Sequence, residues 1–120
     1  MSKESIITDW PEFCLICGAK AEHTHHAIPG TANRAKSDRY GLLMPLCANC
    51  HDMSRDSIHK NPKMASMSKI IGQLAYERDA AIMYCLTSDS IREDNAIHLK
   101  ELVEQTIRDS FVKEFGKSFV

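Results

Sequence analysis

The hydrophobic residues follow a helical period in the second half of the chain. Between Met64 and Met83 they recur every three or four positions, which predicts an amphipathic helix over 62–86. Asn61 and Pro62 suit the N-cap and the first helical position, so they predict where this helix begins.

A second amphipathic helix is predicted after a break at 87–89. Ser90 and Glu93 have the spacing of a capping box at its start, and Gly116 predicts its end. Its apolar face comprises Leu99, Leu102, Val103, Ile107, Phe111 and Phe115. The two helices together form a predicted helical extension over 62–115.

The first half has short alternating segments instead of a helical period. Residues 22–28 predict a strand with His25 and His26 on opposite faces, and residues 40–46 predict the returning strand. Glycine and proline are frequent in the rest of 14–51, which predicts tight turns and loops there. A short helix is predicted from Ala48, and its residues would include Cys50, His51, Arg55 and His59.

Length and composition fit one soluble globular domain over residues 1–120. The chain has 120 residues, of which 43% are hydrophobic and 26% charged, the balance of a folded chain. No apolar run approaches the roughly 18 residues of a membrane helix. The N-terminus lacks the apolar core of a secretory signal. We therefore expect a cytoplasmic protein with no membrane partner.

The net charge of −1 is unevenly distributed along the chain. Residues 18–63 carry seven basic and four acidic side chains, a net charge of +3, whereas residues 71–120 carry six basic and nine acidic ones, or −3. This excludes a uniformly basic nucleic-acid-binding protein. It leaves a mildly basic, histidine-rich region next to an acidic one, although charges scattered over two solvated faces would give the same counts.

Two cysteine pairs predict a structural zinc site. Cys14 and Cys17 form one Cys-x-x-Cys pair, and Cys47 and Cys50 form the other. Two such pairs can supply the four thiolates of a tetrahedral zinc shell with Zn–S distances near ~2.3 Å. In a cytosolic chain, paired cysteines more often bind metal than form disulfides. Cys85 lies alone on a helical stripe and is interpreted as a small core residue.

The histidines near these cysteines exceed the needs of one structural zinc. His25 and His26 lie on the first predicted strand, and His51 directly follows the last zinc cysteine. The zinc would hold the strand and the short helix together. We therefore expect the imidazoles of His25 and His51 to lie close enough to share a second metal ion.

These motifs resemble, in their order, the HNH endonucleases, or ββα-metal nucleases. The matching segments are Cys14-Leu-Ile-Cys17, His25-His-Ala-Ile-Pro29 and Pro45-Leu-Cys-Ala-Asn-Cys-His51. The small HNH proteins of bacteriophages and prophages are similar in further residues: Gly30, Asn33-Arg34, Ser37, Tyr40-Gly41, His59 and Gly72-Gln73. The resemblance covers roughly residues 14–78.

The resemblance implies an α+β fold and a nuclease function. The fold would be a zinc-stapled, treble-clef-like ββα-metal core over 14–59, followed by two amphipathic helices. The activity would be metal-dependent hydrolysis of DNA phosphodiester bonds, in a bacterial host cell and encoded by a phage or prophage. His26 would be the general base that activates water, whereas His25 and His51 would bind the catalytic divalent cation: Mg²⁺, Mn²⁺, Ni²⁺ or Zn²⁺.

Three positions depart from the family pattern. The family's middle Asn aligns near Leu42, which can neither orient a histidine nor bind metal; Asn33 either takes that role or only shapes a turn. Arg55 occupies the position of a further ligand. His59 could replace it, but on a continuous helix it would lie about 11–12 Å from His51. One ion then cannot bind both without a bend, and otherwise His59 is a surface or phosphate-contacting histidine.

Other residues and partners are predicted less specifically. His23 is either an outer partner of the cation ligands or a solvated strand residue, and His98 is interpreted as unrelated. Six basic residues flank the site and could contact DNA phosphates or be solvated: Arg34, Lys36, Arg39, Arg55, Lys60 and Lys63. The helical stripes are long for so small a core, so we expect a homodimer through residues 62–115, or else a hairpin covered in cis.

The alternatives to a DNA endonuclease belong to other functional classes. One is a non-catalytic zinc module that binds nucleic acid or protein with degenerate nuclease residues, an interpretation that Leu42 favours. Another is a recombination accessory protein with weak nuclease activity, or an enzyme that acts on RNA.

Overall fold

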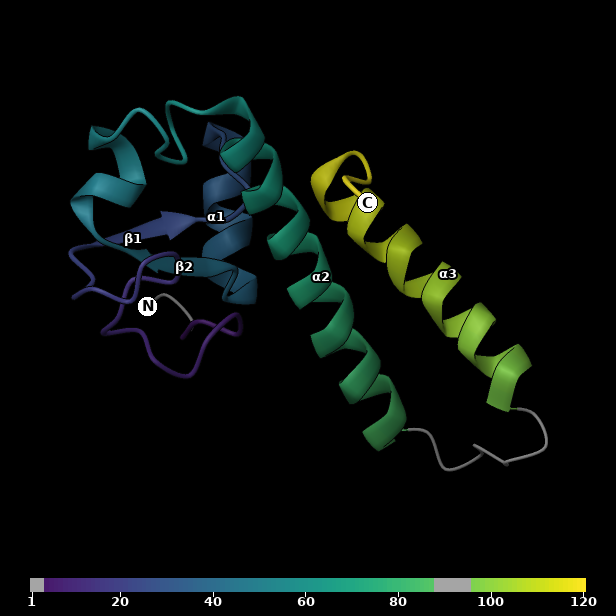
Figure 1. The fold of residues 1–120 in the computed structure, drawn as a ribbon. Helices are drawn as coiled ribbons and strands as arrows, with labels where there is room; N and C mark the ends of the chain where they lie inside the picture. Colours follow the sequence, from purple (N-terminus) through teal and green to yellow (C-terminus); the bar gives the residue numbers. More distant parts are fainter. Residues whose placement is uncertain (1–3, 88–95) are drawn as a thin grey trace.

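Two short strands and four helices make up the part of the chain described by this computed structural model, residues 4–87 and 96–120 (Figure 1). Their bounds are β1 (His23–His26), α1 (Thr31–Tyr40), β2 (Leu43–Leu46), the short π-helix η1 (Asn49–Met53), α2 (Pro62–Thr87) and α3 (Ala96–Phe115). The chain therefore mixes α and β structure, as the sequence predicts.

The two strands form an antiparallel sheet that positions the histidines of β1. His25 lies opposite Met44, and His26 lies opposite Leu43. β2 is buried along its whole length, whereas β1 has a buried His25 beside a half-buried His26. Because neighbouring side chains of a strand point to opposite faces, these two imidazoles leave β1 on different faces of the sheet. The predicted pairing of two strands is confirmed, but the second strand begins at Leu43, because Tyr40 belongs to the helix that precedes it.

Helix α1 connects the strands in a segment for which the sequence analysis predicted loops. Its residues are almost all polar, and of these only Ser37 is buried, where its Oγ donates a hydrogen bond to the Ile28 carbonyl. No apolar period therefore marks this helix in the sequence. Gly41 ends α1 with a φ of 72°, a left-handed conformation in which an added Cβ would overlap the Glu4 carbonyl.

The helix predicted from Ala48 is much shorter than expected. It ends at Met53, so the prediction that it continues through Arg55 to His59 is wrong. The chain instead folds back on η1: the Ile58 N–H donates to the Cys50 carbonyl at 2.9 Å, and the His59 N–H donates to the His51 carbonyl at 3.1 Å. This return provides the bend that one ion needs to reach both histidines.

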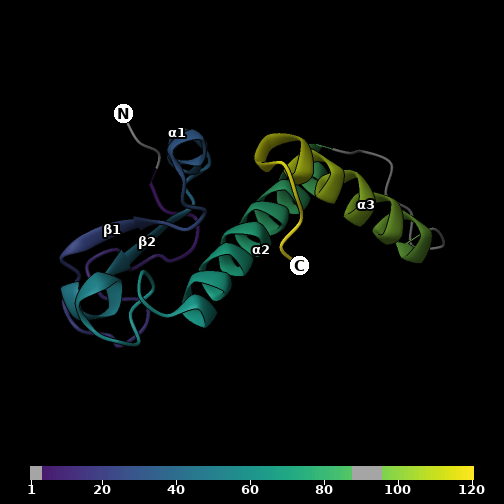
Figure 2. The same cartoon turned by 90° about the horizontal axis from the view of Figure 1, so that it is seen from above.

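Helices α2 and α3 form a hairpin that extends from the sheet (Figures 1 and 2). α2 matches the predicted helix, and α3 ends at Phe115, directly before Gly116 with its φ of 89°. Tyr76 and Phe111 pack edge to face between the helices, with ring centroids 5.3 Å apart. The predicted capping box at Ser90 and Glu93 lies outside the described residues.

The core joins the sheet to the base of this hairpin. Its fully buried members come from the loop after β1, from the residue before β2, from β2 and from α3; they include Ile28, Leu42, Met44, Leu46 and Phe111. Gly72 brings α2 close to the loop after β1, because an added Cβ would lie 3.0 Å from side-chain atoms of Ala27 and Ile28.

The molecule is elongated, with extents of 51 × 26 × 26 Å and a radius of gyration of 15.9 Å. A compact chain of this length would have a radius of gyration of about 13.6 Å. Within residues 4–87 and 96–120, no helix has both the length and the hydrophobicity needed to cross a membrane.

Candidate functional site

The four predicted zinc cysteines lie together at one end of the sheet. The sulfurs of Cys14, Cys17, Cys47 and Cys50 all lie within 4.8 Å of one another, and those of Cys17 and Cys47 are 3.6 Å apart. Around a tetrahedral zinc with Zn–S bonds of about 2.3 Å, neighbouring sulfurs would be about 3.8 Å apart. The group therefore has the composition and the size to hold a structural metal ion.

Backbone hydrogen bonds attach the first cysteine pair to the sheet and close a turn in each pair. The Leu15 N–H donates to the Pro45 carbonyl of β2, which fixes the first pair, and the Gly18 N–H closes a turn onto the Cys14 carbonyl. In the second pair, the His51 N–H donates to the Cys47 carbonyl. A metal ion in this group would hold η1 against the sheet, and with it His51.

The electrostatics of the cysteine group favour a bound cation. Burial raises the pKa of the Cys14 thiol, but backbone hydrogen bonds from Cys17, Cys47 and Ile16 outweigh it and lower this pKa to about 6. The pKa of Cys50 is raised, first by burial and then by the neighbouring cysteines. A cation would offset the repulsion among four thiolates, so metal binding would stabilise the fold directly.

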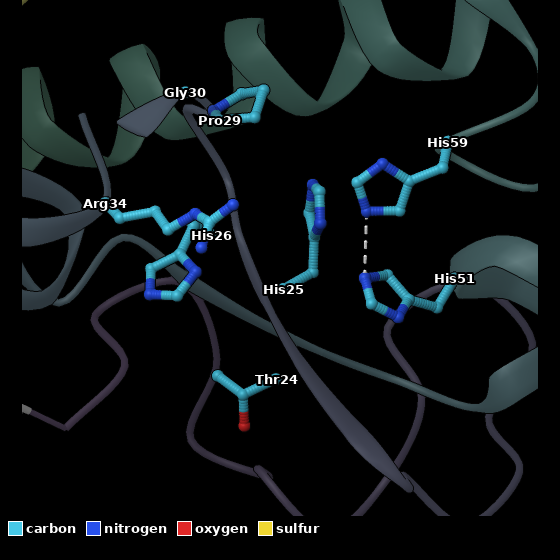
Figure 3. Close-up of a pocket in the computed structure, with 8 residues that line it drawn as sticks. All are labelled: Thr24, His25, His26, Pro29, Gly30, Arg34, His51 and His59. Carbon is cyan, nitrogen blue, oxygen red and sulfur yellow. Dashed lines mark hydrogen bonds between the residues drawn. The ribbon is translucent and has the colours of Figure 1, made fainter. Parts of the chain in front are cut away.

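Three imidazoles, from β1, η1 and the segment before α2, form a second group of possible metal ligands. The ligand atoms of His25, His51 and His59 lie within 4.8 Å of one another. The Nε2 atoms of His51 and His59 are 3.0 Å apart, and the ring centroids of His25 and His59 are 5.0 Å apart. Figure 3 shows the three rings converging. We call these three residues the inner cation group.

A buried hydroxyl fixes the tautomer of His25. Ser68 on α2 donates its single proton to the Ala27 carbonyl at 2.7 Å, while its Oγ lies 3.0 Å from His25 Nε2. Because the hydroxyl proton is already engaged, His25 donates from Nε2 and keeps a lone pair on Nδ1. A protonated Nε2 and a free Nδ1 lone pair are what a metal-binding imidazole requires.

Burial keeps His25 neutral. Its side chain is only 3% exposed, and burial lowers its pKa to about 4, with smaller contributions from His59, His51 and His26. The pKa of His51 is also lowered, mainly by burial and by His59. Both imidazoles are therefore uncharged at neutral pH, and each has a nitrogen lone pair that can bind a cation.

His26 belongs to the same cleft but not to the inner cation group. Its Nε2 donates to the carboxylate of Asp38 on α1 at 3.0 Å. Its ring lines a pocket of about 230 Å³ together with His25, His51, His59 and Arg34 (Figure 3). With Nε2 engaged, Nδ1 is the nitrogen of His26 that can accept a proton.

The remaining residues that the sequence predicts for the site lie in different parts of the structure. The amide of Asn33 donates to the Pro29 carbonyl at 3.2 Å, so this side chain shapes the turn into α1 and lies outside the inner cation group. Leu42 is fully buried in the core. Among the basic residues, Arg34 lines the cleft, whereas Lys36 donates to the Glu114 carbonyl of α3 and Lys60 to the Met53 carbonyl.

Sequence reasoning missed two residues at this site. Asp38 lies on the unpredicted helix α1, and only the recognition of that helix could have placed it beside His26. Ser68 lies on the predicted helix over 62–86, four residues after Met64 on nearly the same helical face, so its position among core residues was a usable signal.

Comparisons of the chain with protein-family models, with curated proteins and with solved structures find no match. The class of site is therefore defined by its own geometry. It consists of a four-cysteine group and a three-histidine group on either side of η1, with an aspartate-bound histidine in the adjoining cleft.

Proposed function

We propose that the chain is a metal-dependent endonuclease of the HNH type, with a zinc-stapled, treble-clef-like ββα-metal core, that hydrolyses DNA phosphodiester bonds. The observation that carries the proposal is the neighbourhood of His26. This aspartate-bound imidazole lines the same pocket as the inner cation group, on the adjacent position of β1. Phosphodiester hydrolysis needs these two elements together, a base for water and a cation for the phosphate.

His26 has the geometry of a general base. Its Nδ1 would accept the proton of the attacking water, and the ring would then carry a positive charge. Asp38, which accepts the Nε2 hydrogen, would stabilise that charge and hold the ring in one orientation, as the aspartate does in a catalytic triad.

The inner cation group would hold a divalent cation through His25, His51 and His59. Bound there, the cation would supply charge neutralisation for the phosphate and for the departing oxygen. Since imidazole ligands carry no negative charge, the bound cation would keep its full positive charge, which would attract an anionic substrate. Imidazole ligands favour Ni²⁺ or Zn²⁺ over Mn²⁺ or Mg²⁺.

Arg34 would position the substrate. It lines the pocket beside His26, and its side chain is exposed. A guanidinium there can form two parallel hydrogen bonds to phosphate oxygens. It would hold the DNA backbone with the scissile phosphate between His26 and the inner cation group.

Cleavage of supercoiled plasmid tests the proposal. Zinc-loaded protein with Mg²⁺, Mn²⁺, Ni²⁺ or added Zn²⁺ should nick the plasmid, and His26→Ala should slow cleavage by about 10²- to 10⁴-fold. His26→Ala should bind the cation as well as the wild type does, because His26 is not a ligand. His98→Ala is the matched control and should cleave normally. Absence of cleavage with every cation and substrate, single-stranded DNA and RNA included, would reject the proposal.

Leu42 supports one second candidate, a non-catalytic zinc module that binds nucleic acid. Leu42 is fully buried and occupies the position near which the family's middle Asn aligns. Under this alternative the protein would bind DNA without cutting it, so a gel-shift measurement beside the plasmid assay separates the two functions.

A further inference from the structure

His51 has a histidine neighbour at each of its ring nitrogens. Its Nε2 faces His59 in the inner cation group, 3.0 Å away, whereas its Nδ1 lies 2.9 Å from Nδ1 of His23. The rings of His23 and His51 meet edge to face, with centroids 5.0 Å apart. His23 is therefore not an isolated solvated histidine of β1, and the Nδ1 side of His51 has a partner of its own.

A carboxylate completes this second arrangement. The ligand atoms of His23, His51 and Asp52 all lie within 4.8 Å of one another. Asp52 follows His51 on η1, and both His23 and Asp52 are exposed, so an ion from solvent can reach them. The donor set of two nitrogens and one carboxylate oxygen carries one negative charge, which partly compensates a divalent cation.

We propose that His23, His51 and Asp52 form a second cation site, the outer cation site, which binds a transition-metal ion through Nδ1 of each imidazole and the carboxylate. Two ligands at about 2.1 Å from one ion and at right angles to each other lie about 3.0 Å apart, close to the observed 2.9 Å. Mixed imidazole and carboxylate donors suit Zn²⁺, Ni²⁺, Co²⁺ or Cu²⁺. The site shares only His51 with the proposed catalytic centre, and it does not require that the protein cut DNA.

Sharing His51 makes the two cation sites compete. A neutral imidazole has one N–H and one lone pair. When an inner cation binds Nε2, the proton is on Nδ1 and points at the outer site; when an outer cation binds Nδ1, the proton moves to Nε2 and points at the inner group. Each cation therefore weakens the other, by reciprocal coupling. An excess of transition metal would fill the outer site and withdraw His51 from the inner group.

Calorimetric titration of zinc-loaded protein with Ni²⁺ tests the outer site without a nuclease assay. The wild type should show a tight and a weaker event. His59→Ala removes a ligand of the inner group alone, so it should retain a Ni²⁺-binding event. Adding Asp52→Asn to His59→Ala should weaken that event at least tenfold. Asp56→Asn, which removes the same charge four residues away, should not.

One outcome of the titration would reject the outer cation site. If Ni²⁺ binding to the His59→Ala protein is unchanged by Asp52→Asn, the remaining ion is held by the remnant of the inner group. The contact between His23 and His51 is then only a hydrogen bond, and the outer site is rejected. Circular dichroism and zinc content of each variant confirm that it is folded. Since the readout is binding, a failed plasmid assay would leave this result intact, and the reverse also holds.

Discussion

At the scale of single residues, hydrogen bonds fix the tautomers of two histidines of the site before any ion binds. Ser68 holds the Nε2–H of His25, and Asp38 holds the Nε2–H of His26. Because Nε2 is engaged in both of these neighbouring histidines, Nδ1 is the available nitrogen of each, and a hydrogen-bond partner on α2 or on α1 determines this.

Ser68→Ala should weaken cation binding at the inner group by about 10- to 100-fold, the usual cost of losing an outer partner of a metal-binding histidine. Without the hydroxyl, the buried His25 can also place its proton on Nδ1, where it blocks the ligand. Titration of zinc-loaded protein with Ni²⁺ measures the change. Ser66→Ala, an exposed serine on the same helix, is the control; equal affinities for the two variants would contradict the role of Ser68.

At the scale of elements, the cysteine group links η1 to the sheet and so determines where His51 lies. The large apolar side chains within the first cysteine pair contribute little to this link, since Leu15 and Ile16 are both exposed. The metal would therefore replace a hydrophobic core in this part of the chain, where structural zinc can supply about 10–16 kcal/mol.

Cys47→Ser should consequently lose the structural zinc and unfold the N-terminal half. One tightly held zinc per chain, bound by the four cysteines, is expected in the wild type and in Cys85→Ser, which changes the cysteine outside the two pairs. Metal analysis by mass spectrometry and far-ultraviolet circular dichroism measure the two effects. A folded Cys47→Ser protein with full zinc content would show that the four cysteines do not hold the ion.

The contact between α2 and α3 has an ionic component with a predictable pH dependence. Arg108 donates to both carboxylate oxygens of Glu77, and Gln73 donates to one of them. Burial raises the pKa of Glu77, but these hydrogen bonds outweigh it, so the net pKa lies below its ordinary 4.5. The folded state then favours the ionised form. The stabilisation is present above pH 4.5 and is lost as the pH falls through the lowered pKa.

Glu77→Gln should therefore lower the urea midpoint at pH 7 by a small amount, because Arg108 is largely solvated and the pair is screened. As the pH falls below 4.5 through the lowered pKa, the difference from the wild type should shrink, since Glu77 becomes protonated. Glu101→Gln, on the exposed side of α3, should have no effect at either pH. A difference that stays constant from pH 7 to pH 2 would contradict the ionic origin.

The elements differ in how far the sequence could predict them, for physical reasons. α2 was predictable because its apolar residues repeat with the period of a helix, and the end of α3 was predictable from Gly116. The strands were predicted from short segments among the turn residues of 14–51, since β1 itself contains only histidine and threonine. α1 was not, because a polar helix that buries only Ser37 leaves no such period. His59 was placed too far from His51 because backbone bonds between 58–59 and 50–51 set the reversal there, and side-chain patterns do not encode them.

At the scale of the whole molecule, the hairpin leaves part of α2 uncovered. α3 packs on the side that carries Tyr76 and Glu77, whereas Met67 and Leu74 on another side are 51% and 49% exposed. Met67 also borders a pocket with Leu15 and Ile16 of the first cysteine pair. Exposed apolar surface of this kind typically marks an interaction site. We therefore still predict a homodimer, and we expect its interface to include this side of α2.

Sedimentation equilibrium at micromolar concentrations measures the mass of the particle and so tests whether the chain forms a dimer. The wild type should sediment at twice the chain mass of 13.5 kDa, and Met67→Glu combined with Leu74→Glu should return it to the monomer mass. Lys63→Glu, an exposed change near the start of α2, should leave the dimer intact. A monomer mass at every loading would show that this surface stays uncovered.

The elongated shape separates the charges of the molecule along its long axis. The sheet and the cysteine group come from residues 14–63, which carry a net charge of +3, whereas the hairpin is formed mostly by the acidic residues 71–120. Such a molecule is an electric dipole, and in the field of a polyanion it rotates before it makes contact. With the proposed DNA substrate, the acidic hairpin would be turned away and the cleft would be turned forward, so encounters would be productive more often at low ionic strength than at high.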